Sequence, residues 1–194
     1  MKLHLAVITA GLLWTMHGPA SASSDIFART EPGQLEIKEL PAGILLESRV
    51  EGAYFENSNR LFRPLFGYIS RHDIAMTTPV EARMEPGAMY FWVAPAEAAK
   101  VAGDEGGVRV IEQPARTVVA VGGRGAYSER NYRAAEAVLR EWLAGQTDWI
   151  AEGDPYGVFW HGPFTPWFRK QYEVHQPLRR TPPPPAAPSE DAAG

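Results

Sequence analysis

Residues 53–80 read AYFENSNRLFRPLFGYISRHDIAMTTPV, and this stretch decides the fold. Its first part predicts a helix, because apolar side chains recur at the spacing of one helix face. These side chains are Leu61, Phe62, Leu65, Phe66 and Ile69. After a polar turn at 70–73 the pattern changes to period two, which predicts a strand over Ile74–Arg83. On this strand the side chains sharing one face are Ile74, Met76, Thr78 and Val80.

The ends of this helix are marked less clearly than its apolar face. Asn57 or Ser58 is a suitable N-cap. Pro64 removes one backbone hydrogen bond, so we expect the helix to kink there or to begin near it.

The same stretch resembles the SOUL haem-binding family. The resemblance is carried by LFRPLFGYI (61–69) and by IAMTTPV (74–80). A late segment, GPFTPWFRK (162–170), leads into Glu173-Val174 and resembles the C-terminal signature of that family. Together the similarity extends over roughly residues 34–178. It implies a SOUL-like α+β fold and haem or another tetrapyrrole as ligand.

The chain also contains an internal repeat with an offset of 73 residues. The identical pairs are Glu39/Glu112, Pro41/Pro114, Ala42/Ala115, Gly52/Gly125, Ala53/Ala126, Tyr54/Tyr127 and Arg60/Arg133. Apolar helix positions recur as well, at 65/138, 66/139 and 69/142. We therefore predict a duplicated unit, with one copy at 35–95 and the other at 108–178.

Each copy is predicted to run strand, strand, helix, strand, strand. In the first copy the strands are Leu35–Leu40, Ile44–Val50, Ile74–Arg83 and Met89–Ala94, and in the second they are Val108–Glu112, Thr117–Val121, Tyr156–Trp160 and Gln171–Pro177. Two such halves predict an α+β fold, in which a mixed sheet closes or nearly closes into a distorted β-barrel with two outer helices.

The second helix is predicted at Ser128–Ala144. Ser128 is its expected N-cap, and Gly145 is its expected stop. Its predicted buried stripe consists of Tyr132, Ala135, Val138, Leu139, Trp142 and Leu143. Before this helix, Gly122-Gly123-Arg124-Gly125 is superficially like a dinucleotide-binding turn. Because Ser128 stands where the third glycine of that motif belongs, we interpret these glycines as turn residues.

Composition limits the function. A net charge of −4 without a basic stripe argues against nucleic-acid binding. The chain has no cysteine, which excludes a thiolate nucleophile, a cysteine zinc site and covalent haem attachment through C-x-x-C-H. No G-x-S-x-G or S-x-x-K motif is present, so the sequence gives no catalytic residues.

Both termini are expected to lie outside the domain. Residues 1–22 have the pattern of a secretory signal with cleavage after Ala22, which predicts export, most simply to a periplasm; an uncleaved anchor is the alternative. Residues 23–33 are then a lead-in, and 34–180 form one domain. Residues 181–194 are a proline-rich tail, for which we predict disorder.

Three histidines remain after the signal, and no pair has metal-site spacing. We expect His72, in the turn after the first helix, to be the best-placed iron ligand, with an ordinary exposed turn histidine as the alternative. His161 and His175 are weaker candidates. Met76 and Met84 are candidates for ligating iron or lining an apolar pocket. A core-filling role is favoured over ligation, which leaves pocket lining open.

The predicted ligand site is an apolar groove between the first helix and the late aromatic loop. Phe66, Phe164 and Trp167 would supply its rings, and Arg63, Arg169 and Lys170 would pair with the carboxylates of a non-covalently bound haem. The alternative for each charged residue is a solvated surface position.

The leading interpretation is therefore a non-enzymatic tetrapyrrole-binding protein, without nucleic acid and without a stable membrane span after signal cleavage. The rival is an effector-binding or hydrolase domain that uses Glu173 in a cleft between the halves, as in the more loosely similar effector-binding modules of bacterial regulators. Glu173 could face the barrel interior, where a buried carboxylate needs a partner or a function. A third reading is an envelope scaffold that docks through the proline-rich tail.

Overall fold

The computed structural model describes residues 25–162 and 164–182. Their strands are β1 (Leu35–Leu40), β2 (Gly43–Arg49), β3 (Val80–Arg83), β4 (Ala88–Val93), β5 (Arg109–Gln113), β6 (Arg116–Arg124), β7 (Trp149–Ala151), β8 (Tyr156–Phe159) and β9 (Gln171–Arg180). Their helices are α1 (Tyr54–Arg71), α2 (Glu129–Ala144) and two short 3-10 helices, η1 (Pro95–Lys100) and η2 (Trp167–Arg169). The predicted signal peptide and all but two residues of the predicted tail lie outside this description.

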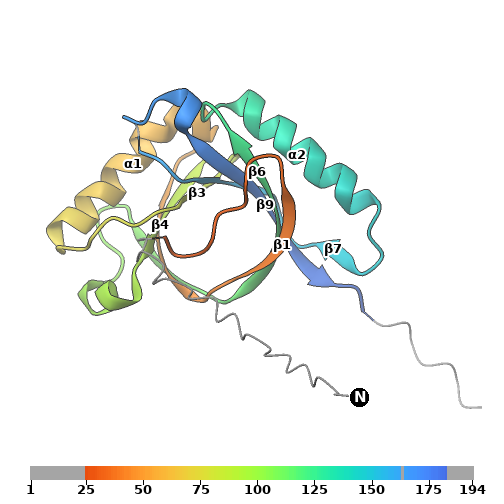
Figure 1. Cartoon of the computed structure of the whole chain (residues 1–194). Coiled ribbons are helices and arrows are strands. Elements are labelled where there is room, and N and C mark those ends of the chain that lie inside the picture. Colours follow the sequence, from red (N-terminus) through yellow and green to blue (C-terminus); the bar gives the residue numbers. More distant parts are fainter. Residues whose placement is uncertain (1–24, 163, 183–194) are drawn as a thin grey trace, which may run out of the picture.

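The strands form one curled sheet with the order β1-β6-β9-β8-β3-β4-β2-β5, and β7 pairs with β9. This order is symmetric about the β8–β3 pair. Strands at the same distance from this pair, such as β1 and β5, are equivalent strands of the two repeats. The halves also exchange their first strands, because β1 pairs with β6 and β5 pairs with β2. In Figure 1 the sheet curls into a half-barrel, with α1 and α2 on its outer side. The predicted α+β fold is confirmed.

The expectation of a mixed sheet was wrong. Every pairing between the named strands is antiparallel. Each outer helix does connect two parallel strands, as a crossover helix should. However, β4 lies between β2 and β3, and β9 lies between β6 and β8, so the parallel strands never become neighbours.

The outer core fills the space between the helices and the sheet. Leu61, Leu65 and Ile69 of α1 are buried there, which confirms the predicted apolar face, whereas Phe66 is half-exposed. The helix begins earlier than predicted, at Tyr54, and its N-cap Ala53 has no side-chain hydrogen bond. Pro64 lies inside this continuous helix and does not mark its start.

The predicted strand from Ile74 was too long, since β3 begins only at Val80. The preceding residues satisfy their polar groups elsewhere: the Ile74 N–H donates to the Ile69 carbonyl at 2.9 Å, and the Thr77 hydroxyl donates to the Trp92 carbonyl at 2.6 Å. Pro79 has no N–H to donate to a strand ladder. As a result Thr77 is buried while Met76 is 43% exposed, the reverse of the expected alternation.

The second helix was predicted well. The Ser128 side chain accepts a hydrogen bond from the Asn131 N–H at 3.3 Å, and α2 ends before Gly145. Of the predicted stripe, Tyr132, Ala135 and Leu139 are fully buried, whereas Val138 is 45% exposed. The short strand β7 was not predicted.

Residues 25–34 are packed onto the inner face of the sheet, whereas residues 23–33 were expected to be a lead-in to the domain. The Phe27 ring lies 5.4 Å from the Trp160 ring and 6.0 Å from the Trp92 ring, between centroids. Gly122 permits this approach, because a Cβ there would collide with the backbone oxygens of Thr30 and Glu31. Gly122 and Gly123 therefore lie inside β6 as close-approach residues, and the interpretation of them as turn residues was wrong.

Over the described residues, no helix is long and apolar enough to cross a membrane.

Candidate functional site

A groove of about 570 Å³ opens between the first two turns of α1, the segment leading into β3, and the residues that follow β8. Most of its surface is apolar. The apolar side chains lining it are Tyr54, Phe62, Met76, Val80, Met89 and Phe159. Polar atoms converge from a few side chains, chiefly Tyr127, His161 and Lys170. A concave, mostly apolar site with a few polar groups is the usual form of a small-molecule pocket.

Three aromatic rings in contact form the floor of this groove. The Phe159 ring lies 5.7 Å from the Tyr54 ring, nearly parallel to it, and 4.5 Å from the Tyr127 ring. Tyr54 and Tyr127 are equivalent positions of the internal repeat, each at the start of an outer helix. The floor therefore lies where the two halves of the chain meet.

Tyr127 also holds the backbone at the end of the groove. Its hydroxyl accepts a hydrogen bond from the His161 N–H at 2.8 Å and donates one to the Gln171 carbonyl at 2.9 Å. Burial raises the pKa of Tyr127 to about 12, so its hydroxyl keeps its proton and can donate. This arrangement fixes the main chain on both sides of the late aromatic loop.

His161 is held in a form suited to ligand binding. Burial, followed by the positive charge of Arg29, lowers the pKa of the His161 imidazole, so the ring is neutral at pH 7. Its Nε2 is buried and has no hydrogen-bond partner in the described part of the chain. Because protein atoms enclose this nitrogen, the ring would have to turn before Nε2 could ligate a metal in the groove.

Lys170 supplies a positive charge at the same groove. Its Nζ lies 4.9 Å from the centre of the Tyr127 ring. No carboxylate of residues 25–162 or 164–182 forms an ion pair with it. The ammonium group therefore remains available to an anionic ligand.

The structure brings together only part of the predicted site. Met76 and Lys170 line the groove. Phe66 lies one step away, with its ring stacked on Phe62 at 5.5 Å between centroids. Arg63 is exposed on α1 and does not line the groove.

His72 lies elsewhere. Its Nε2 is 2.8 Å from Glu105 Oε2, its ring centroid is 4.6 Å from that of Tyr68, and it does not line the groove. Phe164, Trp167 and Arg169 do not line the groove either. Phe164 and Arg169 line a neighbouring hollow, which shares His161 and Gly162 with the groove. The sequence does not single out Tyr54 and Tyr127 as site residues, and it favours His72 over His161, which does line the groove.

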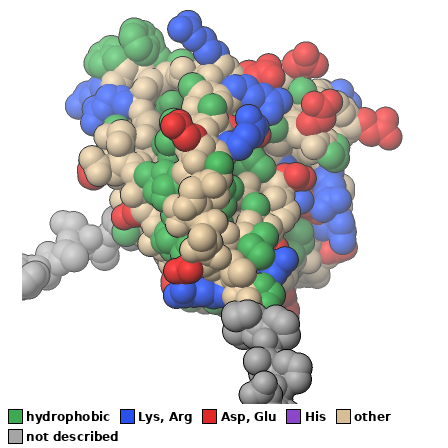
Figure 2. Space-filling view, turned by 90° about the vertical axis from the view of Figure 1, so that its right-hand side faces the viewer, with side chains coloured by type: hydrophobic (Ala, Val, Ile, Leu, Met, Phe, Trp, Pro, Cys, Tyr) green, Lys and Arg blue, Asp and Glu red, His purple; other side chains and the backbone are tan. Residues whose placement is uncertain are grey.

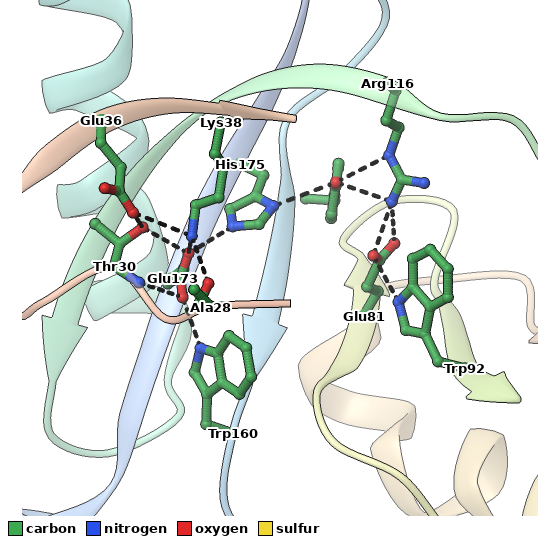
Figure 3. Close-up of polar contacts among 11 residues, drawn as sticks. Ala28, Thr30, Glu36, Lys38, Glu81, Trp92, Arg116, Trp160, Glu173 and His175 are labelled. Atoms are coloured by element: carbon green, nitrogen blue, oxygen red, sulfur yellow. Dashed lines mark hydrogen bonds and ion pairs between the residues drawn. The ribbon is translucent and has the colours of Figure 1, made fainter. Parts of the chain in front are cut away.

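Glu173 belongs to a second polar centre on the inner face of the sheet. Its neighbour Val174 packs into the outer core, so alternation directs Glu173 and His175 to the opposite face. The carboxylate is fully buried and accepts five hydrogen bonds, all 3.0 Å or shorter. The donors are the Thr30 N–H and hydroxyl, Lys38 Nζ, Trp160 Nε1 and His175 Nε2 (Figure 3).

The same network continues to a second buried carboxylate, Glu81. Arg116 Nη2 donates to its two oxygens at 2.7 and 2.8 Å, and Trp92 Nε1 donates to it at 2.9 Å (Figure 3). Arg116 also donates to the Tyr156 hydroxyl. That hydroxyl lies 3.3 Å from His175 Nδ1.

These contacts define the proton positions. An arginine only donates, so Tyr156 accepts from Arg116 and directs its own proton to His175 Nδ1. His175 is then neutral and donates from Nε2 to Glu173, in agreement with its pKa, which burial lowers. Burial alone would raise the pKa of Glu173, but the hydrogen bonds from His175 and Lys38 and the positive charge of Lys38 outweigh it and bring this pKa to about 2.

Every lone pair of Glu173 is therefore engaged by the protein itself. A carboxylate accepting from five donors has no direction left for an incoming cation or for a proton in transfer. The Phe27 ring covers the same region, 5.9 Å from the His175 ring. The arrangement is that of an internal structural network, closed by residues 25–38.

Comparison with known proteins adds a family and a fold. The sequence profile of the SOUL heme-binding protein family matches residues 25–177. No curated protein sequence matches the chain. Three solved structures illustrate the fold and are similar at low sequence identity.

One is the C-terminal domain of EcmrR, with a TM-score of 0.61 and 18% identity, covering 76% of this chain and 98% of that domain. A second is EcmrR in a complex with DNA, with a TM-score of 0.62 and 17% identity; the match covers 76% of this chain but only 58% of that chain. The third is a hydrolase from Listeria innocua, with a TM-score of 0.50 and 11% identity, covering 77% of this chain and 94% of that one.

At such identities these three structures establish the shared fold alone. The family profile, in contrast, spans nearly all the described residues, including both segments that border the groove. The chain belongs to the SOUL heme-binding protein family.

Proposed function

We propose that this chain binds haem or another tetrapyrrole non-covalently in the groove between α1 and the residues after β8. The observation that carries the proposal is the groove itself: about 570 Å³, mostly apolar, with one unpaired ammonium group among its lining residues. Pockets for small organic ligands fall in this range of volume. An amphipathic disc carrying carboxylates suits such a site, since the rings of Phe62 and Phe159 can cover its faces and Lys170 can pair with a carboxylate.

Two side chains of the groove are chemically able to hold iron. Met76 supplies a thioether that is 43% exposed, and His161 supplies a neutral imidazole. Haem, when bound, would contribute its iron as the metal centre. We propose His161 as the iron ligand, because His72 is engaged with Glu105 and His175 is engaged with Glu173.

This function requires no catalytic group, and we propose a binding protein rather than an enzyme. The resemblance to a Listeria innocua hydrolase concerns the fold alone. The Glu173 carboxylate does not favour the rival function of an effector-binding or hydrolase domain, since donors of the protein itself already occupy both of its oxygens. Export directed by residues 1–22 remains part of the proposal, and it would place the binding protein outside the cytoplasm.

The test is a hemin titration of the purified chain followed by Soret absorbance. We expect saturable one-to-one binding, a changed Soret band in His161→Ala, and no change in the matched variant His72→Ala. A changed spectrum in His72→Ala with an unchanged one in His161→Ala would reverse the assignment. No saturable binding by the wild-type chain would contradict the proposed function.

A further inference from the structure

The loop between β8 and β9 exposes more aromatic surface than any other described segment of its length. Phe164 is 98% exposed, Trp167 is 67% exposed and Phe168 is 55% exposed. None of these three side chains lines the groove proposed for the tetrapyrrole. In Figure 1 this segment lies at the top of the molecule, between α1 and α2.

The exposure is not that of a loose loop. The backbone is held by hydrogen bonds from the Thr165 N–H to the Gly162 carbonyl, at 3.2 Å, and from the Arg169 N–H to the Pro166 carbonyl, at 2.9 Å. At its end, the Gly125 N–H donates to the Lys170 carbonyl at 2.9 Å. The backbone of η2 thus presents Trp167 and Phe168 side by side, with ring centroids 5.9 Å apart.

Positive charge accompanies these rings. Arg169 and Lys170 follow them directly, and Arg124 pairs with Gln171 at the base of the loop. None of these three cations forms an ion pair within the described residues. The sequence has no acidic residue between Asp154 and Glu173, although the whole chain carries a net charge of −4. Apolar and basic side chains also stand together at the upper left of the surface in Figure 2, whereas acidic side chains lie at its upper right.

We propose that this loop, residues 164–170, docks the protein on an anionic lipid surface. Trp and Phe favour the boundary between headgroups and acyl chains, and adjacent Lys and Arg are attracted to anionic headgroups. The positive loop on a negatively charged protein orients the molecule toward such a surface. This docking goes beyond tetrapyrrole binding and does not depend on it.

The shape of the loop favours a membrane over a protein partner. A stable protein interface buries roughly 800 Å² on each side and is usually built on a broad surface. Here the apolar surface is the tip of one short loop, which can enter a lipid boundary to the depth of its rings. The loop also adjoins the groove through His161, Gly162 and Lys170, so docking would turn the groove toward the lipid.

The test is co-sedimentation of the full chain with phosphatidylglycerol-containing vesicles and with pure phosphatidylcholine vesicles. The loop variant carries F164S, W167S and F168S, and the matched control carries V138S, which removes a 45% exposed apolar side chain from α2. All proteins share the same N-terminus, so any contribution of residues 1–22 cancels. We expect the loop variant to lose at least about tenfold in vesicle partitioning, and V138S to lose nothing.

A charge variant separates the two contributions. R169E should weaken binding to the phosphatidylglycerol vesicles and leave the weaker binding to phosphatidylcholine unchanged, whereas the control R140E on α2 should do neither. Equal sedimentation of the loop variant and the wild type would overturn the proposal. So would a wild-type chain that binds neither vesicle, and a protein partner would then be the better occupant of the loop.

The hemin titration keeps this result distinct from the proposed function. The loop variant should bind hemin with wild-type affinity, because its three altered side chains lie outside the groove. A wild-type chain that sediments with vesicles but does not bind hemin would contradict the tetrapyrrole proposal and leave the docking proposal supported.

Discussion

Single side chains decide how the inner face of the sheet is used. Glu173 and Lys38 are 135 residues apart in sequence, yet Lys38 Nζ lies 2.8 Å from a carboxylate oxygen of Glu173. Burying such a pair costs solvation free energy, which the remaining hydrogen bonds must offset. Here the tryptophan, histidine and threonine donors do so, because all of them reach the same carboxylate.

Replacing Glu173 by glutamine should therefore destabilise the protein. The amide removes the negative charge, leaves the Lys38 ammonium largely buried without its main partner, and turns an NH2 group toward existing donors. We expect a loss of about 3 kcal/mol in the free energy of unfolding, measured by urea denaturation. The control Glu141→Gln, an exposed position on α2, should change it by less than about 0.5 kcal/mol. If Glu173→Gln keeps wild-type stability, the network is not structural.

The same residues predict how stability depends on pH. The folded-state pKa values of Glu173 (about 2) and His175 are both lower than their ordinary values of 4.5 and 6.5. The unfolded chain therefore binds more protons than the folded chain as the pH falls below these ordinary values. This contribution to stability is fully present at neutral pH, begins to decrease below about pH 6.5 and decreases further below about pH 4.5.

Urea midpoints measured between about pH 7 and pH 3 should fall steadily on acidification. In Glu173→Gln the decrease below about pH 4.5 should be smaller, because that carboxylate no longer titrates. A midpoint that rises as the pH falls would contradict the assigned proton positions.

Among the elements, the segment 25–34 has the most unexpected role. It crosses the inner face of the sheet and supplies Phe27 to the aromatic cluster and Thr30 to Glu173. Glycine at position 122 makes this possible, since a side chain there would meet the backbone of Thr30 and Glu31. Backbone cannot move aside as the end of a flexible side chain can.

Gly122→Ala should thus push this segment away from the sheet. We expect a loss of about 2 kcal/mol in unfolding free energy and faster tryptic cleavage after Arg29. Gly162→Ala is the matched control, because a Cβ at Gly162 has no heavy atom within 4 Å. Wild-type stability and cleavage in Gly122→Ala would show that the close approach does not hold the segment in place.

The elements also show which features local sequence determines. Ser128 caps α2 through its own side chain, so its start was readable from the sequence. The start of α1 was missed because Ala53 offers no side-chain cap. The inverted burial of Met76 and Thr77 was hidden because it depends on a hydrogen bond to Trp92, on a strand that follows later in the chain.

At the scale of the whole molecule, duplication places the groove. Its walls come from both halves: α1 and Met89 belong to the first, and Tyr127, Phe159 and Lys170 belong to the second. The two segments that resemble the SOUL family, 61–80 and 162–170, are far apart in sequence and border this one groove. A groove thus lies between the first helix and the late loop, where the sequence predicts the ligand site, and its use as that site stays a prediction.

The individual groove residues were harder to predict, for a tertiary reason. The His72 ring contacts Glu105, which lies 33 residues later, and does not line the groove. The backbone N–H of His161 donates to the hydroxyl of Tyr127, which lies 34 residues earlier, and this contact holds His161 beside the groove. Neither contact has a local sequence signal, although the repeat does pair Tyr127 with Tyr54.

The most direct test of the proposed binding site is to fill the groove with a large side chain and to measure whether hemin still binds. Ser58 lines the groove on α1, whereas Ser70 is an exposed residue near the other end of the same helix. We would titrate hemin into Ser58→Trp and Ser70→Trp and follow Soret absorbance. The proposed site predicts that Ser58→Trp loses saturable binding while Ser70→Trp retains the wild-type affinity. Unchanged binding in a folded Ser58→Trp variant would contradict it, because the ligand would then have to bind elsewhere.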